Sequence, residues 1–180
     1  MKAWWFDNHD GRLGYDDGRI IRAGRTLKVK GTIELCERGL HGSERLLDAL
    51  KYARSPTLWR VDLGGDILHG DDKVCAAERT HLWRLDIDDI LRDFARRCAL
   101  DAIHLWDAPE IVVRYLKTGD ESLRAASRDA AGDAARAASR DAAGAARAAE
   151  NAAWDAASAA ASDKQNRRLT AMVMAARSKS

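Results

Sequence analysis

The order of hydrophobic and polar positions predicts a sheet in the first half of the chain. From residue 1 to about residue 86, short apolar runs rich in tryptophan and β-branched residues alternate with glycine-containing turns. Runs of this length between turn sequences are typical of strands. We expect strands at 3–6, 19–22, 26–29, 32–36, 58–63 and 81–86, which together would form a small, mostly antiparallel sheet.

One short helix interrupts the predicted strands. Apolar residues recur at helical spacing between Leu46 and Ala53, and Pro56 prevents the helix from continuing. Ser43 has the side chain of a good N-cap and precedes this stretch. We therefore expect a helix that is capped by Ser43 and has one apolar face.

Helical patterns dominate after Asp86. Apolar residues between Ile87 and Cys98 follow helical spacing, and Asp107-Ala-Pro-Glu110 and Thr118-Gly-Asp-Glu121 each resemble a capping box at the start of a further helix. The sequence thus predicts an α+β fold in three parts. These are a β-rich head at 1–86, a helical segment at 87–118 that packs on the head, and an alanine-rich arm at 119–180.

The arm contains an internal repeat whose small residues form rows along a helix. Arg124-Ala-Ala-Ser-Arg-Asp-Ala-Ala-Gly recurs from Arg136, and alanines follow one another at spacings of four, four and three. A repeat of about 3.67 residues per turn keeps such rows nearly straight, so two helices could approach closely along them. Gly132 and Gly144 either mark points of closest approach or allow the arm to fold as a hairpin.

Charge and cysteine content limit the classes of partner. The formal net charge is +2, and the arginines of the arm alternate with aspartates, so we do not expect direct nucleic-acid binding. The chain has no apolar stretch long enough for a membrane span, and its first residues do not form a signal peptide. Three cysteines without a C-x-x-C motif indicate reduced thiols. We therefore predict a cytoplasmic protein without membrane contact.

The sequence offers little support for a metal or cofactor site. The five histidines share no metal-ligand spacing, although Cys36 and His41 are close along the chain. Cys75 and His69 could supply a second pair, but without the tight spacing of structural zinc sites. No phosphate-binding loop and no nucleophile elbow are present. We predict no metal and no cofactor, with a buried thiol and a turn histidine instead.

The stretch from Cys36 to Ser43 is the most distinctive local pattern. It reads Cys-Glu-Arg-Gly-Leu-His-Gly-Ser, and a short helix, the strand at 58–64 and Asp71-Asp-Lys-Val74 follow it. Over roughly residues 25–85 this resembles an uncharacterised domain family of bacterial and prophage proteins. Some members of that family are labelled as immunity proteins and carry alanine-rich tails. The resemblance implies no catalytic residues.

The same stretch has a second resemblance, to the mono-ADP-ribosyltransferases. In those enzymes a Gly-Leu-His or Gly-Leu-Tyr strand, a helix ending in Tyr-Ala and a following strand build the cleft for the nicotinamide dinucleotide. The resemblance implies that His41, Ser43 and Tyr52 line such a cleft, and that Glu78 orients the ribose. This chain departs from the pattern because no first-strand histidine or arginine motif precedes these residues.

Our leading hypothesis from the sequence is a non-catalytic protein of a phage or mobile element that binds and inhibits a host protein complex. Anti-CRISPR proteins are likewise short and poor in motifs, so a CRISPR effector is one such complex. The arm would serve for packing, docking or dimerisation. The candidate partner-binding residues are Trp4, Trp106, Arg136, Arg140, Arg147 and Trp154.

Two alternatives remain open at this point, and each makes a distinct prediction. An NAD-dependent enzyme like the ADP-ribosyltransferases predicts that the candidate catalytic residues His41, Tyr52 and Glu78 converge in a cleft. A structural self-association module predicts that removing residues 119–180 leaves a stable monomeric head. The leading hypothesis predicts instead that aromatic residues such as Trp4 are exposed.

Overall fold

The computed structural model describes residues 1–8, 10–14, 17–105, 107–141 and 150–179, and the side chains of these residues outside 135–161. It confirms the predicted α+β class, because an antiparallel sheet is combined with helices. The strands are β1 (Lys2–Phe6), β2 (Thr26–Lys28), β3 (Leu40–Gly42), β4 (Thr57–His69) and β5 (Val74–Asp86). The α-helices are α1 (Leu46–Leu50), α2 (Asp88–Asp101), α3 (Glu110–Thr118), α4 (Arg124–Asp141) and α5 (Glu150–Arg177).

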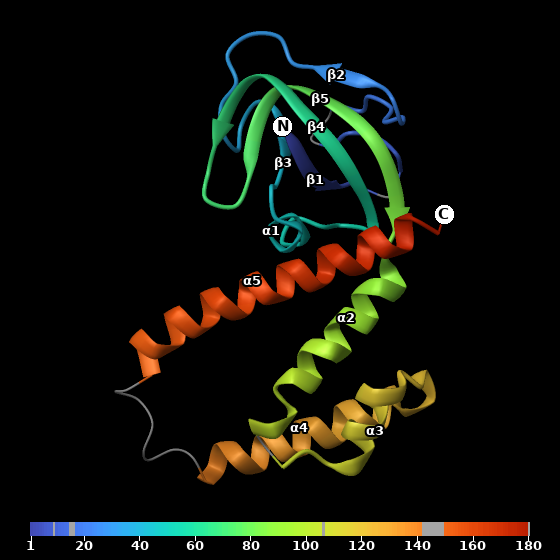
Figure 1. The fold of residues 1–180 in the computed structure, drawn as a ribbon, viewed down its shortest axis with the longest axis vertical. Helices are drawn as coiled ribbons and strands as arrows, with labels where there is room; N and C mark the ends of the chain where they lie inside the picture. Colours follow the sequence, from blue (N-terminus) through green and yellow to red (C-terminus); the bar gives the residue numbers. More distant parts are fainter. Residues whose placement is uncertain (9, 15–16, 106, 142–149, 180) are drawn as a thin grey trace. The chain divides into compact units, whose positions relative to one another are not determined.

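The sheet is organised around the long hairpin of β4 and β5. Its strand order is β1-β4-β5-β2, β3 also pairs with β5, and every pairing is antiparallel. The hairpin curves strongly along its length (Figure 1). Register shifts lie between Arg60 and Val61 and between Gly64 and Ile67, where an additional residue bends a strand. The curvature lets one hairpin form the central part of the head.

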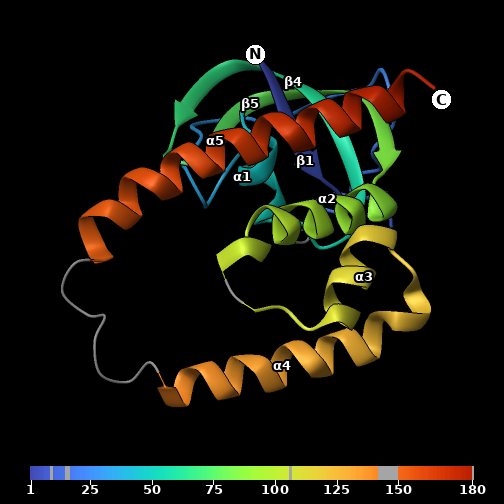
Figure 2. The same ribbon diagram turned by 60° about the horizontal axis from the view of Figure 1, so that its bottom comes forward.

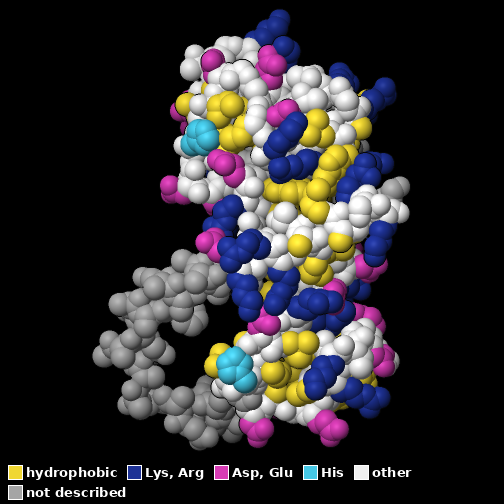
Figure 3. All heavy atoms as spheres, in the orientation of Figure 1, with side chains coloured by type: hydrophobic (Ala, Val, Ile, Leu, Met, Phe, Trp, Pro, Cys, Tyr) yellow, Lys and Arg dark blue, Asp and Glu magenta, His cyan; other side chains and the backbone are white. Residues whose placement is uncertain are grey.

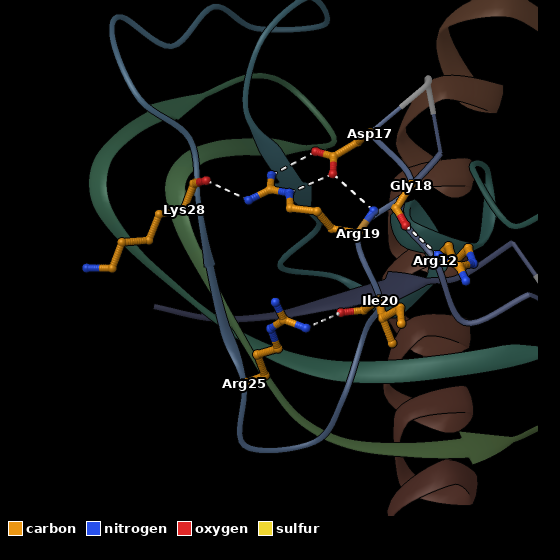
Figure 4. A network of polar contacts seen from close by, with 7 residues as sticks. All are labelled: Arg12, Asp17, Gly18, Arg19, Ile20, Arg25 and Lys28. Atoms are coloured by element: carbon orange, nitrogen blue, oxygen red, sulfur yellow. Dashed lines mark hydrogen bonds and ion pairs between the residues drawn. The ribbon is translucent and has the colours of Figure 1, made fainter.

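One face of the sheet carries the main hydrophobic core. Ala3, Val61 and Leu63 are buried there, and Leu13 and Ile21 from the segment between β1 and β2 cover them. Short-range polar contacts hold this segment in place (Figure 4). Arg19 binds the carboxylate of Asp17 and also donates to the backbone carbonyl of Lys28.

The C-terminal end of α5 completes the head. Leu169 and Val173 have no exposed surface, and Asn166 Oδ1 accepts a hydrogen bond of 3.1 Å from the backbone N–H of Leu47. The guanidinium of Arg177 lies 5.6 Å from the ring centroid of Trp83. Residues 1–88 and 166–180 accordingly form one compact unit. The sequence predicts residues 166–180 as part of the arm, whereas they belong to the compact unit of the head.

Residues 89–165 form the second compact unit. In this unit α3 and α4 lie side by side (Figure 2). Gly119 ends α3 in the left-handed conformation with φ of 68°, which a residue without a side chain adopts readily. Asp120 then caps the short 3-10 helix Glu121–Leu123 by accepting a hydrogen bond from the backbone N–H of Ser122. Whether the arm continues as one helix depends on residues 142–149, which lie outside the described residues.

Several predicted elements differ from the structure. The segments 19–22 and 32–36 are not strands, because the first forms only an isolated bridge from Ile20 to Arg12 and the second runs into a turn. β3 was not among the strands expected from the hydrophobic pattern, although the resemblance to the ADP-ribosyltransferases implies a strand at Gly-Leu-His. β4 and β5 are longer than expected. The predicted cap at Ser43 is wrong, because α1 begins at Leu46 with Arg45 as its N-cap and without a side-chain cap.

Candidate functional site

Cys36 lies in the middle of a tight turn at the surface of the head. Glu34 and Arg38 close this turn with two backbone hydrogen bonds of 2.7 and 2.9 Å. Cys36 has φ of 73° and is the only non-glycine residue with positive φ in the described part of the chain. Such a conformation costs of order 1–3 kcal/mol and persists only where neighbouring contacts enforce it. The turn therefore presents an exposed thiol in a fixed, unfavourable backbone conformation.

His41 is the first of these neighbouring contacts. Its Nε2 accepts a hydrogen bond of 3.2 Å from the backbone N–H of Cys36, so the neutral ring carries its proton on Nδ1. Burial lowers the pKa of His41, and the positive charges of Lys73 and Arg79 lower it further. The backbone carbonyl of His41 accepts a hydrogen bond of 2.6 Å from Arg79 Nη1. His41 is therefore neutral at pH 7 and fixed at both its ring and its backbone.

Lys73 brings a positive charge to the thiol. The side chain of Cys36 is the main cause that raises the pKa of Lys73 above its ordinary value. The Lys73 ammonium lies 4.8 Å from the ring centroid of Tyr52. Lys73 stays protonated at neutral pH and faces both the sulfur and an aromatic ring.

Asp72 links Tyr52 to Lys51 beside this pair. The Tyr52 hydroxyl donates a hydrogen bond of 2.7 Å to Asp72, and Lys51 approaches the other carboxylate oxygen at 3.4 Å. The bond to Tyr52, followed by Lys51 and Lys73, lowers the pKa of Asp72, while Asp72 raises the pKa of Tyr52. We call Cys36, His41, Tyr52, Asp72 and Lys73 the thiol site.

Strand pairing brings the thiol site together from distant parts of the sequence. β3 pairs with the first residues of β5, and His41 lies opposite Cys75. This pairing places the turn at 34–38 next to Lys73, which immediately precedes β5. Tyr52 follows α1 and approaches from a third segment. The site thus depends on non-local pairing that no local pattern encodes.

The predicted catalytic residues do not all meet. Tyr52 contacts the Lys73 ammonium, and the charge of Lys73 also lowers the pKa of His41. Glu78 instead forms an ion pair of 2.6 Å with Lys28 of β2. Strand alternation places Glu78 on the opposite face of β5 from Cys75, which His41 faces. The convergence of all three residues is therefore not found.

Of the predicted partner-binding residues, only Trp4 has a described side chain. Trp4 is only 4% exposed, so its expected role as an exposed contact is wrong. It packs edge-on against Trp83, and the guanidinium of Arg60 lies 4.2 Å from its ring centroid. β1 pairs with β4 and alternates its side chains, so Trp4 points to the face of the sheet opposite Ala3 and is buried there. The other candidates lie outside the described residues or side chains: Trp106, Arg136, Arg140, Arg147 and Trp154.

Charge and metal-binding potential remain modest in the described part of the chain. Lysine and arginine side chains lie among aspartate and glutamate side chains on the face shown in Figure 3. No group of three or more potential metal ligands occurs among the described histidine, cysteine, aspartate and glutamate residues. No described helix is both long and apolar enough to cross a membrane.

Comparison with known proteins places the thiol site inside a recognised segment. Residues 17–93 are similar to a family described as a domain of unknown function, DUF7666. All five residues of the thiol site fall within that segment. No curated protein and no solved structure matches the chain. The resemblance to a bacterial and prophage family stays a prediction, because the family description gives neither function nor source.

Parts of the site are visible in the sequence, but their assembly is not. Cys36 is close to His41 along the chain, and Asp71-Asp-Lys-Val74 belongs to the distinctive pattern. Asp72 and Lys73 carry no predicted role, because nothing local shows that these residues meet Cys36. A thiol beside an ammonium is the arrangement that stabilises a thiolate, which is the nucleophilic form of cysteine.

Proposed function

We propose that the head is a thiol redox module in which Cys36 is the nucleophile. The observation that carries this proposal is the exposed thiol of Cys36, held in a turn at positive φ with Lys73 as its charged neighbour. A positive charge at this position stabilises a thiolate, and exposure gives a reagent access to the sulfur. His41 and Asp72 act as positioning residues, since one binds the Cys36 backbone and the other binds Tyr52 beside Lys73.

Sulfur electrophiles fit this site better than acyl groups. Thiol–disulfide exchange requires a thiolate and an accessible path to the attacked sulfur. Acyl transfer also requires hydrogen-bond donors placed for an oxyanion, and it usually requires a general base at the nucleophile. Nε2 of His41 is already occupied by the backbone N–H of Cys36. In exchange, the Cys36 thiolate attacks one sulfur of a disulfide, a new S–S bond forms, and the other sulfur leaves as a thiolate.

The rate at which Cys36 reacts with a small disulfide tests the proposal. The full chain would carry Cys98→Ser, and the reagent would be 5,5′-dithiobis(2-nitrobenzoate) at pH 7. We expect Cys36 to react first, and Lys73→Met to slow the reaction roughly three- to tenfold because it removes the neighbouring charge. Lys28→Met is the matched control, since Lys28 is paired with Glu78 away from the thiol. Equal rates in the Lys73→Met and Lys28→Met proteins would contradict the proposal.

We also propose a second function, the docking of a partner helix on residues 89–165. The observation in its favour is a groove of about 880 Å³ with mainly small and apolar lining residues, among them Ala99, Ala102, Val112, Ala125 and Ala131. Small side chains allow another helix to approach closely, which agrees with the alanine rows of the sequence. The occupant we propose is the arm of a second copy, so the chain would form a dimer.

Light scattering on the full chain, as it elutes from a size-exclusion column, measures its mass and tests whether it forms a dimer. Ala125→Glu places a charge in the groove and should shift the protein toward the monomer, whereas Ser122→Glu, also exposed, should not. A monomer at all concentrations of the wild-type protein would contradict this function.

Inhibition of a host complex such as a CRISPR effector stays a prediction from the sequence. A tagged pull-down from a lysate with that effector would test it.

A further inference from the structure

Two cysteines lie on either side of the turn at 34–38. Cys36 occupies its exposed middle, while Cys75 is completely buried beneath its two ends. The sulfur of Cys75 lies 3.4 Å from the carbonyl oxygen of Arg38 and 3.8 Å from that of Glu34. These are the residues whose backbone hydrogen bonds close the turn. The second thiol is thus held directly against the base of the turn that carries the first.

Cys75 has little room to move. A Cβ atom at Gly39 would lie 2.1 Å from its sulfur, so the backbone packs as closely as a glycine allows. Burial raises the pKa of Cys75, and the charge of Cys36 raises it further. Cys75 is therefore protonated and inaccessible while the turn keeps its shape. An external reagent must react first at Cys36.

We propose that Cys36 and Cys75 form a reversible intramolecular disulfide. Cys36 is the cysteine that reacts with the oxidant, and Cys75 is the resolving cysteine. This inference rests on the proposed function, because it requires Cys36 to be the reactive thiol. It adds a second cysteine, a hydroperoxide as the class of oxidant, and a consequence for the site.

The chemistry balances with one hydroperoxide. The Cys36 thiolate attacks one peroxide oxygen, the O–O bond breaks, and Cys36 becomes a sulfenic acid while hydroxide leaves and takes a proton from solvent. Cys75 then loses its proton to solvent and attacks the Cys36 sulfur. The S–O bond breaks, and the hydroxyl group leaves as water after protonation. Two thiols are oxidised by two electrons, and hydrogen peroxide is reduced to two molecules of water.

The turn must fold down onto β5 for the disulfide to close. A disulfide requires Cα atoms about 4.4–6.8 Å apart, and only a short turn separates Cys36 from the base where Cys75 lies. Two backbone hydrogen bonds hold this exposed turn, and its central residue already has an unfavourable φ. Closing the disulfide withdraws the sulfur from Lys73 and the Cys36 N–H from His41. Oxidation therefore disassembles the thiol site, and reduction restores it.

Peptide mapping after oxidation tests the inference. The full chain with Cys98→Ser would be treated with one to two equivalents of hydrogen peroxide, alkylated, digested without reduction and analysed by mass spectrometry. We expect the peptides of Cys36 and Cys75 to be joined within one chain, and dithiothreitol to separate them. In the Cys75→Ser protein, Cys36 should stop at the sulfenic acid and react with dimedone. Lys73→Met should slow the cross-link by the same factor as the reaction with the disulfide reagent.

The possible failures are distinguishable. If Cys36 reacts rapidly with the disulfide reagent but accumulates as sulfenic or sulfinic acid in the presence of Cys75, the inference is wrong and the proposed function stands. Disulfides between chains instead of within one chain would overturn it in the same way. If Cys36 does not react with either reagent, both are wrong. The mapping of the Cys98→Ser protein alone decides the outcome even where Cys75→Ser disturbs folding.

Discussion

At the scale of single residues, β5 carries two buried polar side chains beneath the thiol site. Arg79 is 2% exposed, its guanidinium lies 3.9 Å from the ring centroid of Trp5, and it donates to the His41 carbonyl. Burial lowers the pKa of Arg79 to about 9, which leaves it positively charged at neutral pH. A buried charge of this kind is costly unless it is paired or hydrogen-bonded. The hydrogen bond from Arg79 to the His41 carbonyl fixes β3, the strand that carries His41.

Replacing Arg79 should therefore separate function from stability. Arg79→Met keeps the length of the side chain but removes the charge and the donor to His41. Because a well-packed apolar side chain can replace a buried charge without loss, we expect the free energy of unfolding to change by less than about 1 kcal/mol or to rise. The reaction of Cys36 with a small disulfide should slow roughly threefold or more. Urea unfolding and the exchange rate measure the two effects, and an unchanged exchange rate would show that Arg79 does not support the thiol site.

His81 makes the stability of the head dependent on pH. The ring lies edge-on to Trp5 and Trp59, and burial lowers its pKa to about 3, with Arg79 adding to the effect. The unfolded chain takes up this proton near pH 6.5, whereas the native chain does so only near pH 3. The contribution of neutral His81 is thus complete above pH 6.5 and is lost as the pH falls toward 3.

A variant without this titration tests the assignment. In His81→Phe the ring remains aromatic but binds no proton. Between pH 6.5 and 4, the wild-type protein should lose up to about 1.4 kcal/mol of unfolding free energy per pH unit more than the variant. Urea unfolding at pH 7, 5.5 and 4 measures the difference. Parallel curves for the two proteins would show that His81 is not the group responsible.

At the scale of elements, the sequence predicted what depends on local pattern. Alternating apolar residues identified β1, β2 and the adjoining halves of β4 and β5, and helical spacing identified α2 and α3. The hydrophobic pattern did not identify β3, because three residues carry too little periodicity and the strand depends on pairing with β5. The thiol site was not predicted for the same reason, since Lys73 comes close to Cys36 only through that pairing. The chemistry of the residues was visible in the sequence, but their proximity was not.

Gly39 connects the turn to β5 and offers a test of this close packing. Its φ is 148°, and an added Cβ would lie 2.1 Å from the Cys75 sulfur. Gly24 is the matched control, because its φ of 76° is also positive but nothing lies within 4 Å of an added Cβ. Gly24→Ala should cost only the conformational penalty of about 1 kcal/mol. Gly39→Ala should cost about 1–3 kcal/mol more, because it also overpacks the strand.

Urea unfolding measures both losses, and a double variant identifies their cause. Cys75→Ala removes the sulfur, so Gly39→Ala should cost less in that background than in the wild-type protein. Equal losses in the two backgrounds would mean that the sulfur does not limit the approach of the turn.

At the scale of the whole molecule, the head is built from both ends of the sequence. Residues 166–180 belong to the same compact unit as residues 1–88. Leu169 and Val173 are fully buried, and Asn166 accepts a hydrogen bond from the backbone N–H of Leu47 in α1. The self-association hypothesis predicted a stable head without residues 119–180. We now expect that truncation to expose apolar surface and to destabilise the head.

Point substitutions test this expectation without removing any chain. Leu169→Ala should lower the free energy of unfolding by about 2–5 kcal/mol, because it leaves a cavity in a fully buried position. Met174→Ala is the control on the same helix, since Met174 is 48% exposed and should change stability by less than about 0.5 kcal/mol. Alkylation of Cys75 under native conditions reports opening of the head itself, because this thiol is inaccessible in the folded protein. If Leu169→Ala accelerates the alkylation of Cys75 and Met174→Ala does not, the end of α5 stabilises the sheet and its thiol site. If neither substitution changes the rate, residues 166–180 are dispensable for the head.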